Sequence, residues 1–179
     1  SLNWLKLKKD YLEGMGDSVD LVPIGAYYGR GKRTGVYGAY LLACYDVDTE
    51  EFQSVCKIGT GFSDEDLKTL SDELKEHIIP EKTSQYNTSD SLKCDVWFDA
   101  CKVWEIKAAD LSKSSSHKGA VNKTGEIGRG IGLRFPRFER IRGDKKPEQA
   151  TTSDQILEMY YAQDSIQQDE KLNLVDEGI

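Results

Sequence analysis

Long apolar runs are missing from this chain of 179 residues. No stretch approaches the roughly 20 consecutive apolar residues that a membrane-spanning helix needs, and residues 1–10 lack the apolar core of a secretory signal. We therefore expect a soluble protein with no membrane partner. With 38% hydrophobic residues, the chain can bury one ordinary core but is too short for two full domains.

Cysteine and histidine are also scarce. The residues of these two types are Cys44, Cys56, Cys94, Cys101, His77 and His117. Their spacing matches no zinc-binding pattern, so we expect small buried thiols in a reducing compartment and no metal site.

Positive charge is in deficit overall, since the formal net charge is −7, but it is unevenly spread. Residues 46–99 carry five basic and fourteen acidic side chains, whereas residues 100–146 carry twelve basic and five acidic ones. Many of these basic residues fall in Gly132–Lys146, GLRFPRFERIRGDKK. Because screening acts over about 10 Å, a basic face can bind a polyanion although the whole protein is acidic. The alternative is that each arginine is a solvated strand residue.

The first half of the chain reads as three strands and a helix. Leu21–Tyr28 and Val36–Tyr45 are apolar runs around a basic, glycine-rich connection, which predicts a β-hairpin with a long tip. Pro23 indicates an edge strand or a bulge. EEFQSVCKIG supplies a third strand. Ser63 predicts a helix start, because Asp66 follows at capping-box spacing and Leu67, Leu70, Leu74 and Ile78 follow at helical spacing.

The second half is predicted to contain a loop over residues 77–91, strands in VWFD and VWEIKAADL, and a flexible basic linker over residues 112–130. The arginine-rich stretch is the expected last strand, and a helix is expected from Thr152 to about Gln167, with Ile156, Met159 and Tyr160 facing inward. This order predicts a mainly β fold, a five-stranded oligonucleotide-binding (OB) Greek-key barrel with a plugging helix and a C-terminal helix.

The GRGKR motif lies at the predicted hairpin tip. Gly29 and Gly31 allow a tight turn, so Arg30, Lys32 and Arg33 can project toward an anion. The spacing fits neither a P-loop nor a dinucleotide fingerprint. It favours contact with a nucleic-acid backbone, and a solubilising turn is the alternative.

Two further motifs combine cations with apolar residues. In RFPRFERIR, Pro136 interrupts the strand alternation, so we expect one of Phe135 and Phe138 in the core and the other exposed. An exposed aromatic ring among arginines can stack on bases or wedge between them. In WLKLKKDYL, alternation places Lys6 and Lys8 on one face, which suits a phosphate or a solvated edge strand equally.

Three stretches in order carry a family resemblance. WLKLKKDYLEGMGDSVDLVPIGAYYGRGKR, CKIGTGFSDEDL and GLRFPRFERIRGDKKPEQATTSDQI resemble the C-terminal part of eukaryotic ATP-dependent DNA ligases of the replicative type. The resemblance implies the end of an adenylation domain at 1–14, an OB-fold domain at 15–165 and a flexible tail at 166–179. It also implies a nuclear nucleotidyltransferase that seals nicks through enzyme-adenylate and DNA-adenylate intermediates in DNA replication, repair and recombination.

The resemblance assigns roles residue by residue. It implies that ATP or AMP phosphates are bound by Lys6, Lys8, Arg142, Asp144 and Lys145. It implies that DNA is bound by Arg30, Lys32, Arg33, Arg134, Phe135 and Arg137, with Phe135 in the minor groove. ATP and Mg²⁺ are the implied cofactors, both acting mainly through the adenylation domain.

One signature of that family is absent. The nucleophilic lysine belongs to a Lys-x-Asp-Gly motif, which does not occur in this sequence. We therefore expect a fragment that is inactive alone, whose partners are nicked double-stranded DNA and the adenylation and N-terminal DNA-binding domains. Residues 10–20, with Gly14 and Gly16, are the candidate hinge between its two orientations.

Two alternatives remain open from the sequence. The messenger-RNA capping guanylyltransferases share the paired-lysine strand and the final motif, but they are not expected to carry RFPRF or GRGKR. A non-catalytic OB module for single-stranded nucleic acid would not need Lys6, Lys8 or the Arg-x-Asp-Lys motif.

Overall fold

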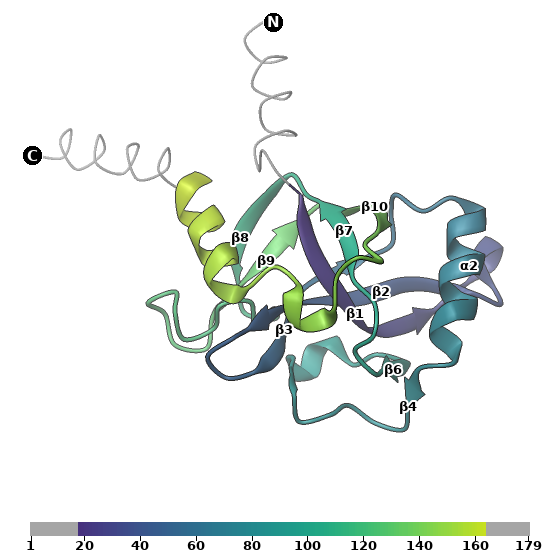
Figure 1. Ribbon diagram of the computed structural model, residues 1–179, viewed down its shortest axis with the longest axis horizontal. Helices are drawn as coiled ribbons and strands as arrows, with labels where there is room; N and C mark the ends of the chain where they lie inside the picture. Colours follow the sequence, from purple (N-terminus) through teal and green to yellow (C-terminus); the bar gives the residue numbers. More distant parts are fainter. Residues whose placement is uncertain (1–17, 164–179) are drawn as a thin grey trace, which may run out of the picture.

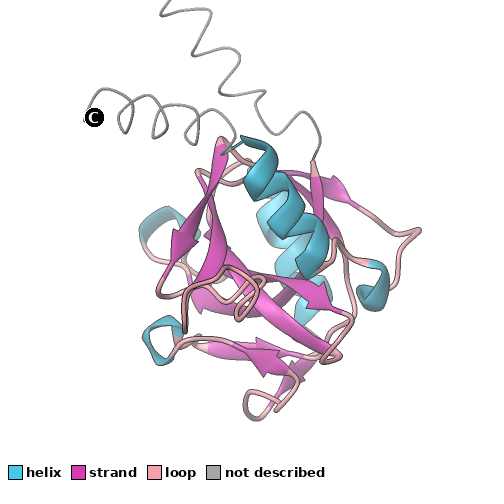
Figure 2. Cartoon of the chain, turned by 90° about the vertical axis from the view of Figure 1, so that its left-hand side faces the viewer, coloured by secondary structure: helices cyan, strands magenta, loops and turns pink. Residues whose placement is uncertain are grey.

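The computed structural model describes residues 18–163 (Figure 1). Lys6, Lys8, the predicted hinge up to residue 17 and the predicted tail lie outside these residues. The fold is mainly β, with one sheet of eight strands and a second sheet of two. Helix α2 and a helix over residues 153–163 lie on opposite sides of the sheets (Figures 1 and 2). No described helix is long and apolar enough to span a bilayer.

The predicted hairpin is present. Strand β1 (Val19–Tyr28) pairs antiparallel with β2 (Tyr37–Asp46), and the tip holds a short 3-10 helix, η1 (Gly31–Arg33). Pro23 lies at a register shift of this pair, so the predicted bulge is confirmed. The edge-strand alternative is wrong, because β1 also pairs with β7 (Trp104–Lys107) and β6 (Val96–Phe98).

The third strand and the first helix also follow the prediction. Strand β3 (Glu51–Ile58) pairs with β2, and α2 spans Asp64–Lys75. The Ser63 hydroxyl accepts a hydrogen bond from the Asp66 N–H, and the Asp66 carboxylate accepts one from the Ser63 N–H. These reciprocal bonds satisfy two N–H groups that a helix start leaves unpaired.

The predicted loop over residues 77–91 contains two short strands. Strand β4 (Ile78–Ile79) pairs with β6, and β5 (Tyr86–Asn87) pairs parallel with β3. Ile78 therefore leaves the helix, and 45% of it is exposed. A 3-10 helix, η2 (Asp90–Leu92), follows. The helical spacing misled here because it continued past the true end of α2.

The predicted last strand is two strands in different sheets. Strand β9 (Gly130–Arg134) pairs with β8 (Asp110–Ser114), whereas β10 (Arg137–Ile141) pairs with β7. The backbone turns between them at Phe135, whose φ is 55°, and at Pro136, which cannot donate to a strand ladder. VWEIKAADL is split in the same way, between β7 and β8.

The predicted flexible linker packs against the sheet. Its N–H groups at Lys118 and Gly119 donate to the Ser54 carbonyl, and Ala120 is fully buried. Lys123 Nζ lies 2.8–3.0 Å from the carboxylate oxygens of three aspartates elsewhere in the chain. These partners are Asp46, Asp48 and Asp154. The linker interpretation was wrong because the sparse apolar residues of this segment gave no periodic signal.

Aromatic side chains fill the centre of the larger core. Trp104 is fully buried, with its ring centroid 4.9 Å from that of Tyr40 and 5.5 Å from that of Phe138. Ile156 buries the second helix against the same core, as predicted. Thr60 joins the two ends of the curved sheet, since its carbonyl accepts from the Phe138 N–H and its hydroxyl donates to the Pro136 carbonyl. The strand ladder itself does not close among the described residues.

Candidate functional site

The hairpin tip presents two of its three cations to solvent. Arg30 and Lys32 are exposed, whereas Arg33 is half-buried. Arg33 Nη1 donates to the carbonyls of Gly38 and Gly59, at 2.8 Å each. Arg33 therefore ties the tip to β2 and to the end of β3, and it does not project with the other two.

The turn between β9 and β10 exposes an aromatic ring. The Phe135 side chain is 71% exposed. Its backbone has a left-handed φ of 55°, which is unfavourable for a bulky residue. The guanidinium carbon of Arg134 lies 5.4 Å from the ring centroid, and Arg134 Nε lies 3.5 Å from an Asp110 carboxylate oxygen. Phe138 is 7% exposed and stacks on Phe62. Of the two candidate rings, Phe138 belongs to the core and Phe135 faces solvent.

Two further cations, Arg137 and Lys107, lie beside this turn. Arg137 on β10 is directly opposite Lys107 on β7, and both side chains are exposed. Opposed residues on antiparallel strands point to the same face, and like charges there are unfavourable without an anion between them. Lys107 was missed from the sequence, because only the strand register places it beside Arg137.

The Arg-x-Asp-Lys motif lies after the other end of β10 and is surrounded by carboxylates. Arg142 Nε and Nη2 donate to the two oxygens of Asp144, at 3.0 and 2.9 Å. Its Nη1 lies 3.3 Å from both oxygens of Asp20 and 3.6 Å from a Glu105 oxygen. Lys145 Nζ donates to Asp20 at 2.7 Å. The structure thus brings Arg142, Asp144 and Lys145 together around Asp20.

The bidentate contact between Arg142 and Asp144 shifts the pKa of both side chains. The hydrogen bond from Arg142 lowers the pKa of Asp144 to about 2, and the bond to Asp144 raises the pKa of Arg142 further above its ordinary value. Both groups are therefore charged across the physiological pH range. A charged bidentate guanidinium edge is suited to a phosphate as well as to a carboxylate.

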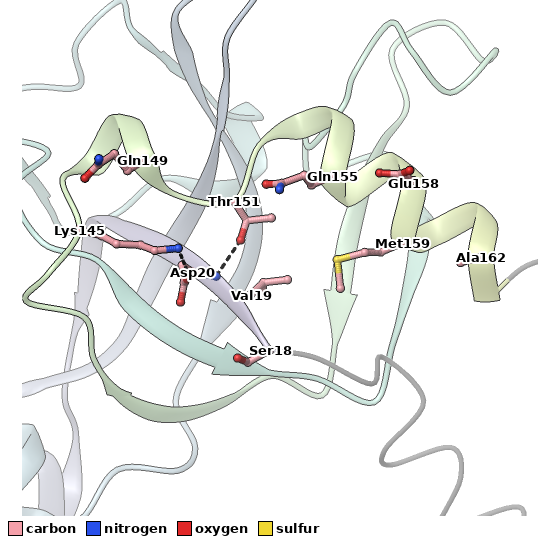
Figure 3. A pocket seen from close by; sticks show the side chains of 10 residues that line it. All are labelled: Ser18, Val19, Asp20, Lys145, Gln149, Thr151, Gln155, Glu158, Met159 and Ala162. Atoms are coloured by element: carbon pink, nitrogen blue, oxygen red, sulfur yellow. Dashed lines mark hydrogen bonds and ion pairs between the residues drawn. The ribbon is translucent and has the colours of Figure 1, made fainter.

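An open hollow of about 480 Å³ lies beside this motif (Figure 3). Asp20 and Lys145 line one part of it, and Gln155, Glu158 and Met159 of the C-terminal helix line another. The hollow borders the start of β1, where the chain leaves toward the residues that the structure does not describe.

The described residues offer no cluster of three or more side chains that could hold a metal ion. Cys44 and Cys56 are buried free thiols, and burial raises the pKa of Cys44 to about 12. These two thiols are therefore protonated at neutral pH and are not reactive thiolates.

This small β-domain carries both an Arg-x-Asp-Lys cluster and an exposed aromatic turn. Comparison with known families shows which family it belongs to. Residues 33–145 match the model described as the ATP-dependent DNA ligase C-terminal region. The chain belongs to this ligase family.

Curated relatives agree with the assignment. The chain is 59% identical over 177 residues to DNA ligase 1 of Dictyostelium discoideum, covering 99% of this chain and 15% of that protein. It is 61% identical over 163 residues to DNA ligase 1 of Arabidopsis thaliana, covering 91% of this chain and 20% of that protein. The chain thus spans no more than a fifth of the length of these two relatives. It is the C-terminal region of a ligase, and the guanylyltransferase alternative loses its support.

Solved structures support the fold. The ligase domain of LigD from M. tuberculosis superposes with a TM-score of 0.58 at 18% identity, covering 75% of this chain and 38% of that one. At this identity the likeness concerns the fold alone. Asp20 bonds to both Arg142 and Lys145, but no motif in the sequence assigned it a role beyond its place at the end of the candidate hinge.

Proposed function

We propose that this chain is the OB-fold domain, over residues 15–165, of a nuclear ATP-dependent DNA ligase that seals nicks in duplex DNA during replication, repair and recombination. The adenylation domain, which ends near residue 14, and an N-terminal DNA-binding domain belong to the same enzyme. The catalytic lysine lies upstream, and this domain binds and positions its substrates.

Phe135 is the observation that carries the proposal. A fold that exposes 71% of a phenylalanine, at an unfavourable φ and beside an arginine, pays in stability for a ring that contributes nothing to the core. A ring of this kind can wedge into a minor groove and stabilise locally distorted DNA. A nick is a natural target, because one backbone is broken there and the duplex deforms more easily.

The exposed cations would hold the DNA around this wedge. Arg134 and Arg137 flank Phe135 in the sequence, and Arg30 and Lys32 project from the hairpin tip. Contacts from these side chains to phosphates fix orientation without reading base sequence. Arg33 supports the tip through its two carbonyl contacts, which makes it the least accessible of the predicted DNA-binding residues.

In the ATP-dependent step, the upstream lysine would attack the α-phosphorus of ATP, forming a phosphorus–nitrogen bond as pyrophosphate leaves. Arg142 and Lys145 would orient the departing pyrophosphate, and Lys6 and Lys8 would hold the phosphate that remains. Mg²⁺ would offset phosphate charge. We assign it no ligand here, because the described residues offer no metal cluster.

Labelled ATP tests this division of labour. The isolated chain should form no covalent adenylate with ATP and Mg²⁺, whereas the full-length enzyme should form one and should seal nicked duplex DNA. The Arg142→Ala enzyme should lose self-adenylation but still seal DNA that is already adenylated. A labelled band at the mass of the isolated chain, or normal adenylation by Arg142→Ala, would contradict the proposal.

A further inference from the structure

Asp20 is a buried carboxylate that faces both cations of the Arg-x-Asp-Lys motif. It is the second residue of β1, and its side chain is 12% exposed. Both of its oxygens lie 3.3 Å from Arg142 Nη1, and one lies 2.7 Å from Lys145 Nζ. Among the described residues, Asp20 is thus the carboxylate that bonds to both groups proposed to bind pyrophosphate.

The backbone around Asp20 is fixed on both sides. Its N–H donates to the Thr151 hydroxyl at 2.8 Å (Figure 3), and its carbonyl accepts from the Thr151 N–H at 2.8 Å. On the other side, Asp20 is opposite Glu105 in the β1–β7 pair. The backbone of Asp20 is therefore fixed, and its carboxylate cannot turn away without breaking its bonds to Arg142 and Lys145.

Asp144 is held differently. It grips the outer edge of Arg142 through Nε and Nη2, but its side chain is 66% exposed and it follows Gly143, which has open space around it. Replacing the Asp144 carboxylate with a phosphate on that edge would preserve both charge-assisted hydrogen bonds. Arg142 therefore has one edge on a fixed carboxylate and one edge on a carboxylate that can be displaced.

We infer that Asp20 is a positioning residue of the ATP-dependent step. It holds Lys145 and the inner edge of Arg142, so that the outer guanidinium edge meets the pyrophosphate end of ATP when Asp144 moves away. This inference rests on the proposed function of Arg142 and Lys145. Without Asp20, the two cations would keep their charge but lose their common orientation.

The test is Asp20→Asn in the full-length enzyme, which keeps the size of the side chain and removes its charge. We expect the KM for ATP with Mg²⁺ in self-adenylation to rise about tenfold or more. Sealing of pre-adenylated nicked DNA should stay unchanged, because that reaction does not use ATP. Asp46→Asn is the matched control. Asp46 is also a buried aspartate that forms an ion pair with a lysine, Lys123, but it has no contact with the Arg-x-Asp-Lys motif.

The two variants separate positioning from folding. Both should lower the melting temperature, but only Asp20→Asn should raise the KM for ATP. Where Asp20→Asn does not fold, Thr151→Val replaces it, since this variant removes the hydroxyl contact to the Asp20 N–H and leaves the carboxylate; it should raise the same KM by a smaller factor.

An unchanged or lowered KM, or an equal rise in Asp46→Asn, would overturn the role of Asp20. Arg142→Ala serves as the reference. Normal self-adenylation by Arg142→Ala refutes the proposed function itself. Impaired self-adenylation by Arg142→Ala together with normal kinetics of Asp20→Asn refutes only the inference about Asp20.

Discussion

Replacing Phe135 with alanine removes a ring that the fold holds outside its core. Phe138, three residues later, is the matched control, because it has the same side chain at 7% rather than 71% exposure. The Phe138 ring stacks on Phe62 at a centroid distance of 4.8 Å and meets Trp104 edge-on at 5.5 Å. The two substitutions therefore remove the same atoms from opposite environments.

The expected stability changes differ by several kcal/mol. Phe138→Ala should cost about 3–5 kcal/mol of folding free energy, because it leaves a cavity among packed rings. For a domain of this size, that loss lowers the melting temperature by about 6–20 °C. Phe135→Ala should change folding stability by no more than about 0.5 kcal/mol, because the ring has few neighbours to lose.

Two activities of the full-length enzyme complete the assay. Phe135→Ala should leave self-adenylation by ATP unchanged, since that step uses no DNA. It should slow the sealing of nicked duplex at least about tenfold, since unstacking a base step costs a few kcal/mol and an inserted ring offsets part of that cost. A large fall in melting temperature, with both activities declining together, would refute the reasoning and return Phe135 to the core.

Two more predictions follow from the described contacts. Arg30→Ala and Lys32→Ala should each weaken DNA binding without base preference and reduce the log-log salt slope by roughly one, as measured by titration at several salt concentrations, whereas Arg33→Ala should chiefly lower the melting temperature. If the salt slope were the same in Arg30→Ala, Lys32→Ala and Arg33→Ala, the proposed difference between the exposed cations and Arg33 would be contradicted. Burial lowers the pKa of His117 to about 4, below its ordinary value of about 6.5, so the unfolded chain binds more protons between these values. Folding stability should therefore fall as the pH falls from about 6.5 to about 4, by about 2 kcal/mol at pH 5. Urea unfolding at pH 7.5 and 5 should show this loss in the wild-type chain and not in His117→Gln.

Local patterns in the sequence predicted local structure well. The β1–β2 hairpin and the start of α2 depend on neighbouring residues: two apolar runs around glycines, and a serine three positions before an aspartate. The capping bonds of Ser63 and Asp66 were therefore predictable. The end of α2 was missed although Pro80 marks a stop, because Ile78 continues the helical spacing and β4 forms only through its pairing with β6.

Contacts between residues far apart in the chain could not be predicted from the sequence. Asp20 and Arg142 are separated by 122 positions, and Lys107 meets Arg137 only through the β7–β10 register. Arg142 and Arg137 stand in motifs, but their partners Asp20 and Lys107 stand in none that indicates a binding role. The split between β9 and β10 was partly signalled by Pro136, but the φ of 55° at Phe135 was not, because bulky residues rarely adopt it.

Strand β10 gives a geometric reason for two functional orientations of this domain. Phe135 precedes the strand and Arg142 follows it, and a strand advances about 3.3 Å per residue, so the two lie roughly 20 Å apart along the chain direction. One reacting phosphate cannot be close to both. An enzyme that uses Arg142 in the ATP-dependent step and Phe135 at the nick must therefore turn this domain between steps. Asp20 was expected at the end of the hinge but lies in β1, where its bonds to Arg142 and Lys145 tie the motif to the strand that follows the proposed hinge.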